Sequence, residues 1–261
     1  MNSKGFLLFD IDGVIRDVTD SYRLSIQKTV KSFCGWYPTI EDIDKLKNEG
    51  NWNNDWDASF ELIRRFQKSN HSKNVITKKT KIIDTFNYFY FGGDIKGKSE
   101  NWKGFIKNEK LLVKKKIFDE LTISGIKWGF VSGAEPPSAK FILEKKLGLK
   151  NPPLIAMGDA IEKPNPSGFI SLVSKLAQKS FELINEPIAY LGDTVADVLT
   201  VKNAKKEFPM QNVISFAVAP PHLHKSQKSA LRIIYENNLL DSGADIILEK
   251  TSDVLNYTKE W

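Results

Sequence analysis

Short, nearly continuous apolar runs are the feature that most restricts how this chain of 261 residues can fold. Each run ends at turn residues and lacks the apolar–polar alternation of a strand with one exposed face. Strands that are buried on both faces of a parallel sheet have this pattern. The runs are residues 6–9, 128–131, 154–157, 188–191, 213–218 and 246–248.

Segments with apolar residues at helical spacing separate most of these runs from residue 112 onward. Ser167 is the expected N-cap of one of them. Strand alternating with helix predicts an α/β protein with a doubly wound, Rossmann-like parallel sheet. The predicted helices are residues 138–147, 167–176, 196–204 and 226–237.

Residues 18–111 interrupt this alternation. The region is rich in aromatic and charged residues, and its clearest periodicity is helical, as in 58–67 and 80–90. No strand is predicted there, and the polar, glycine-rich segment 94–104 is expected to be a loop. We therefore expect a discontinuous core domain, formed by 1–17 and 112–261, with an inserted helical domain at 18–111.

Composition limits the class of partner. With 41% hydrophobic residues, 27% charged residues and a net charge of +6, the chain has the make-up of a globular protein. The lysines are scattered and no nucleic-acid-binding motif is present, so we expect solvated lysines and no nucleic-acid partner. No signal peptide or membrane-spanning run is recognisable, which predicts a cytoplasmic protein without a membrane partner.

A single cysteine, Cys34, excludes an internal disulfide bond and a cysteine-rich metal site. It lies in a mixed apolar stretch with no histidine near it in the sequence. We expect a packed, inert thiol rather than a nucleophile.

Polar residues that suit catalysis follow four of the predicted strands. Ligands of an open α/β sheet bind beyond the carboxyl ends of its strands, so these side chains are expected to converge on one edge. Two carboxylates at the end of a buried strand are energetically costly unless they form ion pairs or bind a metal. The residues are Asp10 and Asp12, then Ser132 and Gly133, then Asp159 and Lys163, and finally Asp193, Thr194 and Asp197.

The segments DIDGVIRD, FVSG, EKPNP and LGDTVAD occur in this order, each at a predicted strand end or in the loop after it. Together they resemble the four motifs of the haloacid dehalogenase superfamily. The insert after the first motif resembles the helical C1 cap of subfamily I, in its phosphatase-like branch IA. The resemblance implies a hydrolase that uses Mg²⁺.

The resemblance also implies roles for individual residues. Asp10 would be the nucleophile that forms an aspartyl-phosphate, and Asp12 the general acid and then the general base. Mg²⁺ would lie between Asp10, the backbone carbonyl of Asp12 and Asp193. Asp197 would be a nearby ligand or an anchor of the ligands. The phosphate would be bound by Ser132, the N–H of Gly133 and Lys163, which offsets negative charge.

The second aspartate indicates the type of reaction. Dehalogenating members of the superfamily lack a carboxylate at the place of Asp12, because a halide leaves without a proton. Mutases of the sugar-phosphate branch carry a histidine in the first cap helix, where this chain has Tyr22 and Arg23. These comparisons favour a phosphatase that acts on a small phosphorylated metabolite. A phosphomutase or phosphotransferase is the alternative, followed by a non-catalytic binding protein.

Arg16 is the residue of the first motif that the resemblance does not explain. It is predicted to contact the anionic part of the substrate, or else to pair on the surface with Asp17 or Asp20.

Other residues admit two interpretations each. Aromatic and amide residues of the insert would contact the substrate and determine specificity, or would form the core of the insert. The histidines after the run 213–218 are expected to be loop residues rather than metal ligands. Glu135 is expected to be a charge at a helix N-terminus. Monomer and dimer both remain open. The residues of the insert are Trp52, Asn53, Asn54 and Trp56, and the histidines are His222 and His224.

Overall fold

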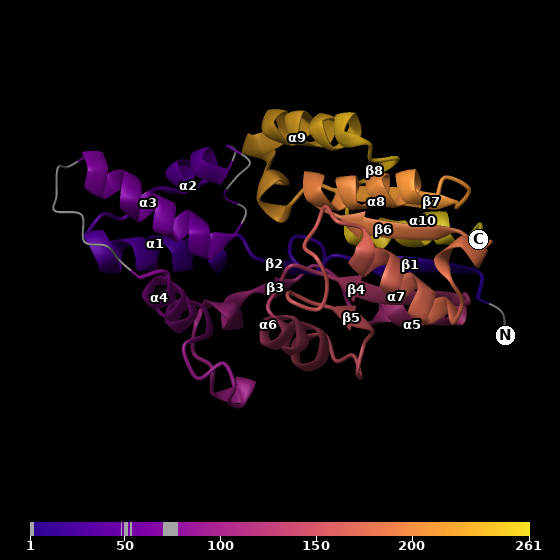
Figure 1. Ribbon diagram of the computed structural model, residues 1–261, viewed down its shortest axis with the longest axis horizontal. Coiled ribbons are helices and arrows are strands. Elements are labelled where there is room, and N and C mark those ends of the chain that lie inside the picture. Colours follow the sequence, from indigo (N-terminus) through magenta and orange to yellow (C-terminus); the bar gives the residue numbers. More distant parts are fainter. Residues whose placement is uncertain (1–2, 48, 50–51, 53, 70–77) are drawn as a thin grey trace. The chain divides into compact units, whose positions relative to one another are not determined.

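The computed structural model describes residues 3–47, 49, 52, 54–69 and 78–261. The chain divides into two compact units, which Figure 1 colours along the sequence. The first unit comprises Met1–Asp17 and Lys110–Trp261, and the second comprises Val18–Glu109. Asn53, which we singled out in the sequence, lies outside the described residues.

A six-stranded sheet, parallel at every pairing, forms the centre of the first unit, in the order β5-β4-β1-β6-β7-β8. Leu8 of the first strand pairs with Gly129 on one side and with Tyr190 on the other. The chain thus winds outward in both directions from β1, which confirms the predicted doubly wound fold. The strands are β1 (Gly5–Phe9), β4 (Ile126–Val131), β5 (Leu154–Ile155), β6 (Ile188–Gly192), β7 (Val213–Val218) and β8 (Ile246–Leu248).

Strand β5 is shorter than the predicted run 154–157. The N–H of Ala156 donates to the Asp159 carboxylate over 2.9 Å, and the N–H of Met157 donates to the carbonyl of Ala134 over 3.0 Å. Both groups are therefore used in a turn rather than in the sheet, so the second half of that strand prediction is wrong.

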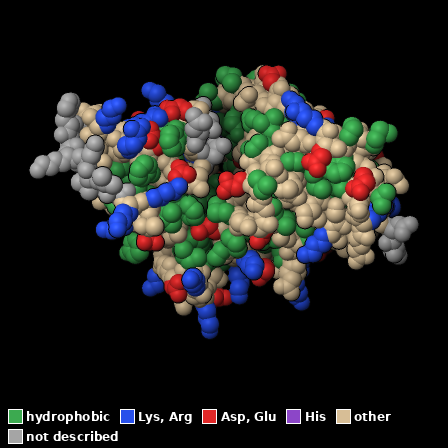
Figure 2. Space-filling model, in the orientation of Figure 1, with side chains coloured by type: hydrophobic (Ala, Val, Ile, Leu, Met, Phe, Trp, Pro, Cys, Tyr) green, Lys and Arg blue, Asp and Glu red, His purple; other side chains and the backbone are tan. Residues whose placement is uncertain are grey.

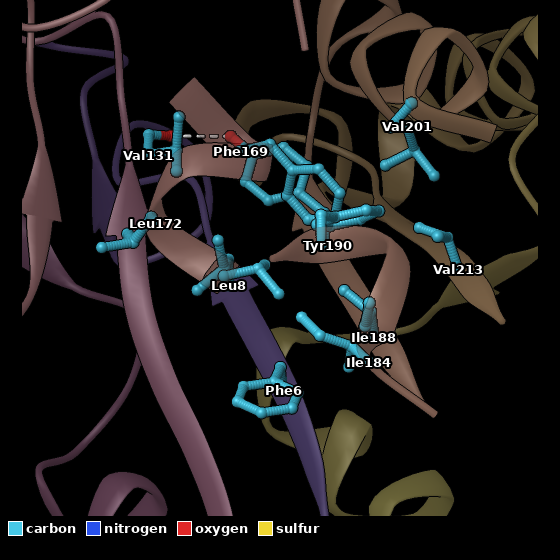
Figure 3. Close-up of a cluster of buried hydrophobic side chains, with 13 residues drawn as sticks. Phe6, Leu8, Val131, Phe169, Leu172, Ile184, Ile188, Tyr190, Val201 and Val213 are labelled. Atoms are coloured by element: carbon cyan, nitrogen blue, oxygen red, sulfur yellow. Dashed lines mark hydrogen bonds between the residues drawn. The ribbon is translucent and has the colours of Figure 1, made fainter. Parts of the chain in front are cut away.

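Apolar side chains cover both faces of the sheet. Phe6 and Leu8 lie in a buried cluster with Tyr190 of β6 and Phe169, as Figure 3 shows. Phe9 faces the other way and contacts the ring of Phe118, with centroids 5.5 Å apart. Alternate residues of β1 thus pack against different helices, which is why its sequence is apolar throughout.

The helices of the first unit differ from the predicted ones mainly at their ends. Ser167 is the first helical residue rather than the N-cap, and its N–H donates to the side chain of Asn165. The predicted helix 138–147 consists of an α-helix followed by a π-helix, and the helix predicted at 226–237 starts with a 3₁₀ turn. The helices are α5 (Lys116–Ile123), α6 (Pro136–Lys140), the π-helix η3 (Phe141–Lys146), α7 (Ser167–Ala177), η4 (Phe181–Leu183), α8 (Val195–Glu207), η5 (Pro221–Leu223), η6 (Ser226–Lys228), α9 (Ser229–Ser242), η7 (Thr251–Asp253) and α10 (Val254–Thr258).

The described part of the second unit is helical. Tyr22 stacks on Tyr90 with ring centroids 4.6 Å apart, and the hydroxyl of Tyr90 donates to the buried carboxylate of Glu109. Aromatic residues of this unit therefore contribute to its own core. Its helices are α1 (Tyr22–Cys34), α2 (Ile40–Lys47), α3 (Asp55–Ser69), α4 (Lys79–Phe91), η1 (Ser99–Asn101) and η2 (Phe105–Asn108).

Two short strands, β2 (Arg16–Asp17) and β3 (Lys110–Leu111), pair antiparallel, with Arg16 opposite Leu111. Both strands belong to the first unit. The expectation of no strand within 18–111 is therefore wrong at Lys110 and Leu111. Two-residue strands are too short to show a periodicity in the sequence.

The surface agrees with a dispersed charge pattern. Figure 2 shows Lys and Arg side chains interspersed with Asp and Glu on the visible face, among apolar and neutral groups. None of the helices in the described ranges is both long enough and apolar enough to cross a membrane.

Candidate active site

Asp10 is the first residue beyond β1, at the edge of the sheet where the strand order reverses. Its N–H donates to the carbonyl of Leu191 in β6 over 2.8 Å, which holds Asp10 against the neighbouring strand. The residue is only 4% exposed. The buried strand thus delivers a carboxylate to the place where ligands of doubly wound sheets bind.

Gly13 brings the loop after β1 against the end of β6. Its φ is +75°, and a Cβ atom at this position would lie 1.9 Å from Oδ2 of Asp193. No other residue type fits there without displacing the Asp193 carboxylate. The glycine of DIDG is therefore required by a close approach as well as by a turn.

Asp197 lies in the first turn of α8 and is 1% exposed. The hydroxyl and the N–H of Thr194 donate to its Oδ2 over 2.6 and 3.0 Å, while the Thr194 hydroxyl accepts from the N–H of Asp197. This capping box fixes the start of the helix and the rotamer of the carboxylate.

Lys163 connects the strand ends. Its ammonium donates to Oδ1 of Asp10 over 2.9 Å and to Oδ1 of Asp197 over 2.5 Å. It also lies 3.2 Å from the hydroxyl of Tyr190, which donates to the carbonyl of Val131 over 2.7 Å, the dashed line in Figure 3. The lysine is thus held in one position by groups from three segments of the fold.

Three buried carboxylates gather at this edge. Within the described part of the chain, Asp10, Asp193 and Asp197 each offer an oxygen, and these oxygens lie within 4.8 Å of one another. With Lys163 the ionised cluster holds three negative charges and one positive charge, a net charge of −2. A buried excess of this size favours either bound protons or a bound divalent cation.

The pKa values reflect this crowding. Burial, opposed by Lys163 and reinforced by Asp197, raises the pKa of Asp10 from 3.8 to about 7. Burial, with the charges of Asp197 and Asp10, also raises the pKa of Asp193 well above its usual range. Burial acts on Asp197 in the same direction, but the charge and hydrogen bond of Lys163, together with the hydrogen bonds from Thr194, outweigh it and lower the pKa of that carboxyl. Both Asp10 and Asp193 therefore hold their protons to higher pH than an exposed aspartate does.

Asp12 differs from these residues in its surroundings. Its side chain is 26% exposed, and its Oδ1 accepts from Nε of Arg16 over 2.5 Å. Arg16 itself is fully buried, and its NH1 donates to the hydroxyl of Ser138 over 2.8 Å. The surface location expected as one alternative for Arg16 is therefore wrong, because the guanidinium has no exposed surface, while its pairing with Asp17 or Asp20 stays a prediction.

Ser132 and Gly133 follow β4 as predicted. The Ser132 N–H donates to the carbonyl of Ile155, and its hydroxyl accepts from the N–H of Ala134 over 3.2 Å. Gly133 is exposed, with no atom near the place of a Cβ. Asp159, the other predicted residue of the third strand end, caps the turn after β5 through Ala156.

The remaining candidates have local roles in the structure. His224 Nε2 lies 2.8 Å from the carbonyl of Ala219 in its own loop. Arg23, one of the two residues that we compared with the mutase histidine, donates to Asp44 over 2.6 Å. Burial raises the pKa of Cys34, which agrees with an inert thiol.

Other residues singled out in the sequence lie in turns or at helix ends. The Asn54 side chain accepts from the N–H of Trp56 over 2.9 Å at the start of α3, and the indole N–H of Trp52 donates to Glu49 over 3.1 Å. Glu135 stands at the N-cap position of α6 and makes no side-chain capping bond. His222 lies in η5.

Two residues that contact the site were not identified from the sequence. Tyr190 reads as an ordinary core residue of an apolar run, and Ser138 as an ordinary helix residue. Their partners, Lys163 and Arg16, lie far away along the chain, so no local pattern reveals them. The T-x-x-D spacing of Thr194 and Asp197, in contrast, is a recognisable capping signal.

Comparison with known proteins identifies a matching family. Residues 6–205 match the model of the haloacid dehalogenase-like hydrolases. A curated relative, the imidazoleglycerol-phosphate dehydratase of Phytophthora nicotianae, is 31% identical over 200 residues, which are 76% of this chain. The match spans 41% of the length of that relative.

Solved structures share the fold. A hydrolase from Pseudomonas syringae aligns with a TM-score of 0.64 at 16% identity, over 100% of this chain and 99% of its own. Phosphatase Tt82 from Thermococcus thioreducens aligns with a TM-score of 0.59 at 20% identity, over 90% of this chain and 99% of its own.

Proposed function

Because the chain belongs to the haloacid dehalogenase-like hydrolase family, we propose that it is a phosphatase that hydrolyses a small organic phosphate monoester. The observation that carries the proposal is the contact of Lys163 with both Asp10 and Asp197 beside Asp193. A buried ammonium at a carboxylate cluster, at the switch point of a doubly wound sheet, suits a phosphoryl group.

In the first step, the Asp10 carboxylate attacks phosphorus while the bond from phosphorus to the ester oxygen breaks. Asp12 gives its proton to the departing oxygen, so that an alcohol leaves and an aspartyl-phosphate remains. Asp12 suits this role because its carboxyl is partly exposed, whereas Asp10 is buried. Ser132 and the N–H of Gly133 bind phosphate oxygens.

In the second step, Asp12 takes a proton from water, and the resulting oxygen attacks phosphorus. The bond between Asp10 and phosphorus breaks, which releases inorganic phosphate and restores the carboxylate. Lys163 compensates the charge of Asp10 in both steps and keeps its carboxylate oriented.

Mg²⁺ fits the carboxylate cluster. The net charge of −2 and the raised pKa values of Asp10 and Asp193 mark a site that lacks positive charge. Asp10, Asp193 and the backbone carbonyl of Asp12 would hold the ion, with Asp197 as a further ligand or an anchor. Bound there, Mg²⁺ would neutralise negative charge on the transferring phosphoryl group.

Substrate choice belongs, in this proposal, to the helical unit. The core is formed by Met1–Asp17 and Lys110–Trp261, and Val18–Glu109 act as a cap domain in the sense of subfamily I. Trp52 and Trp56 are the candidates there for contact with the organic part of the substrate. Because the matched relative is named for imidazoleglycerol phosphate, this ester is included first in the substrate panel.

The experiment is a screen of p-nitrophenyl phosphate and a panel of metabolite phosphates, with Mg²⁺ and with EDTA. We expect wild type to release phosphate only with Mg²⁺, and the Asp10→Asn variant to lose activity by at least about 10³-fold. Asp241→Asn, which changes an exposed carboxylate on α9, is the matched control and should keep wild-type activity. Equal inactivity of wild type and Asp10→Asn on the whole panel would overturn the proposal.

Phosphoryl transfer between sugar hydroxyls remains the alternative. Tyr22 and Arg23 stand in the stretch where mutases carry a histidine, and Arg23 is paired with Asp44, which favours hydrolysis. Phosphorus NMR on a sugar 1-phosphate separates the two activities, because a mutase forms the isomeric sugar phosphate and a phosphatase forms free phosphate.

A further inference from the structure

The contact between Arg16 and Asp12 concerns how the proton is transferred. We propose that Arg16 is a positioning residue, which binds Oδ1 of Asp12 and so leaves Oδ2 as the oxygen that exchanges the proton. The inference rests on the proposed function, since it concerns the general acid of that reaction.

The backbone after β1 brings the two side chains together. The Gly13 N–H donates to the carbonyl of Arg16 over 2.9 Å, and the Arg16 N–H donates to the carbonyl of Ile11 over 3.1 Å. The backbones of Asp12 and Arg16 form an isolated β-bridge, and Arg16 also pairs with Leu111 in the short antiparallel sheet. The loop therefore folds back on itself and places Arg16 beside Asp12, four residues earlier.

Burial makes the contact strong. A guanidinium with no exposed surface is stable only when carboxylates or other acceptors bind its N–H groups. Nε donates to Asp12 and NH1 donates to Ser138, over 2.5 and 2.8 Å. Because the guanidinium is planar, contacts at two of its nitrogens fix the plane of the group and thereby the position of Asp12 Oδ1.

The arrangement decides which oxygen of Asp12 carries the proton. Oδ1 already faces the N–H of Arg16, so a proton on Oδ1 would meet another donor. The proton therefore resides on Oδ2, passes to the ester oxygen as the bond to phosphorus breaks, and is replaced by a proton from water in the second step. The partial exposure of Asp12 is compatible with access of Oδ2 to a substrate.

Direct contact of Arg16 with the phosphate gives a different expectation. A phosphate-binding arginine would act on every ester alike, because all of them carry the same phosphate. A residue that positions the general acid matters most for poor leaving groups, which need the proton, and little for good leaving groups.

The test compares kcat/KM for 2,4-dinitrophenyl phosphate and for the best alkyl phosphate of the panel. This ratio includes only steps up to the departure of the alcohol, which is the half-reaction that uses Asp12 as an acid. We expect Arg16→Gln to lose about 10²-fold on the alkyl ester and less than about threefold on the dinitrophenyl ester. Arg16→Lys, which keeps the charge but not the planar fork, should recover only part of the loss.

Two further variants separate positioning from folding. Ser138→Ala removes one acceptor of NH1 and should show the same selectivity for the alkyl ester at about three- to tenfold, even if Arg16→Gln does not fold. Thr251→Val removes the hydrogen bond from Thr251 to the carbonyl of Val14 in the same loop. This variant should lower kcat/KM for both esters equally or not at all.

Equal losses on the two esters in Arg16→Gln and Ser138→Ala, or full rescue by Arg16→Lys, would overturn the positioning role while leaving the phosphatase proposal intact. Absence of phosphatase activity in wild type would overturn the proposed function, and this inference with it.

Discussion

The Lys163 ammonium donates to Oδ1 of Asp10 over 2.9 Å, although the two residues lie 153 positions apart in the chain. Both side chains are mostly buried, at 16% and 6% exposure, so water screens their interaction little. Burial disfavours the charged form of Asp10, and Lys163 is the group that opposes this effect most. The pair therefore controls the charge of the proposed nucleophile.

Replacement of Lys163 by Met should lower kcat/KM by about 10² to 10³-fold, because a preorganised charge is lost from a buried site. Since Lys163 lowers the pKa of Asp10, its loss should also move the rising limb of the pH–rate profile to higher pH. Steady-state kinetics across the pH range measure both effects. Lys127→Met is the control, because Lys127 binds a backbone carbonyl at the surface. An unshifted limb in Lys163→Met would contradict the assigned role.

Substitution of Gly13 tests the close approach to Asp193. Gly13→Ala introduces a Cβ atom where Oδ2 of Asp193 lies, in addition to the strain of a φ of +75°. Gly35 has the same φ and no atom within 4 Å of a Cβ, so Gly35→Ala is a control for strain alone. We expect the free energy of unfolding to fall by about 1 kcal/mol for Gly35→Ala and about 3 kcal/mol for Gly13→Ala.

Only the Gly13 variant should also lose the rise in melting temperature that Mg²⁺ produces, because its Asp193 carboxylate is displaced. Denaturant unfolding and thermal shifts measure the two effects. Similar stability and similar Mg²⁺ response in both variants would contradict the close approach.

The effect of pH on the metal-free protein follows from Asp10. Its pKa is about 7 in the folded state and 3.8 in the reference state. Between these values the folded protein holds a proton that the unfolded chain has lost, so stability falls as pH rises through this window. Asp193 acts in the same direction, because burial raises its pKa as well.

Mg²⁺ competes with these protons. We therefore expect the Mg²⁺-induced rise in melting temperature to be larger at about pH 8 than at about pH 5.5. Thermal unfolding with Mg²⁺ and with EDTA at the two pH values measures it, and Asp193→Asn should abolish the difference. A larger Mg²⁺ effect at the lower pH would contradict the sign.

Tyr190→Phe tests the support behind Lys163. The variant removes a buried hydroxyl that donates to the carbonyl of Val131 and accepts from Lys163. The loss should lower the free energy of unfolding by about 1–2 kcal/mol and reduce kcat/KM a few-fold. Tyr88→Phe, at a 69% exposed position, should change neither quantity noticeably. Chemical denaturation and kinetics on the same preparations provide the comparison.

Much of the fold was predictable from local patterns. Residues 6–9 and 188–191 are apolar because both faces of β1 and β6 are buried, and burial on both faces leaves a direct trace in composition. The end of β5 was not predictable in the same way. Its ladder stops because the Asp159 carboxylate takes the N–H of Ala156, and apolar content does not record such a competition.

The candidate site was likewise predictable only in part. The order of DIDG, SG, KP and GDTVAD along the chain indicated which residues gather at the sheet edge, because parallel strands end on the same side. The burial of Arg16 was not predictable, since its partner Ser138 lies 122 positions away, in α6. Arginine beside aspartates in a sequence is more often solvated.

The sequence by itself determined the order of strands and helices, the family, and the residues available for catalysis, because apolar periodicity and motif spacing are properties of neighbouring residues. Only the tertiary structure decided that Lys163 joins Asp10 to Asp197, that Tyr190 supports Lys163, and that Arg16 binds Asp12 rather than water. These contacts depend on distances between segments that are remote in the chain, and such distances are set by how the sheet assembles.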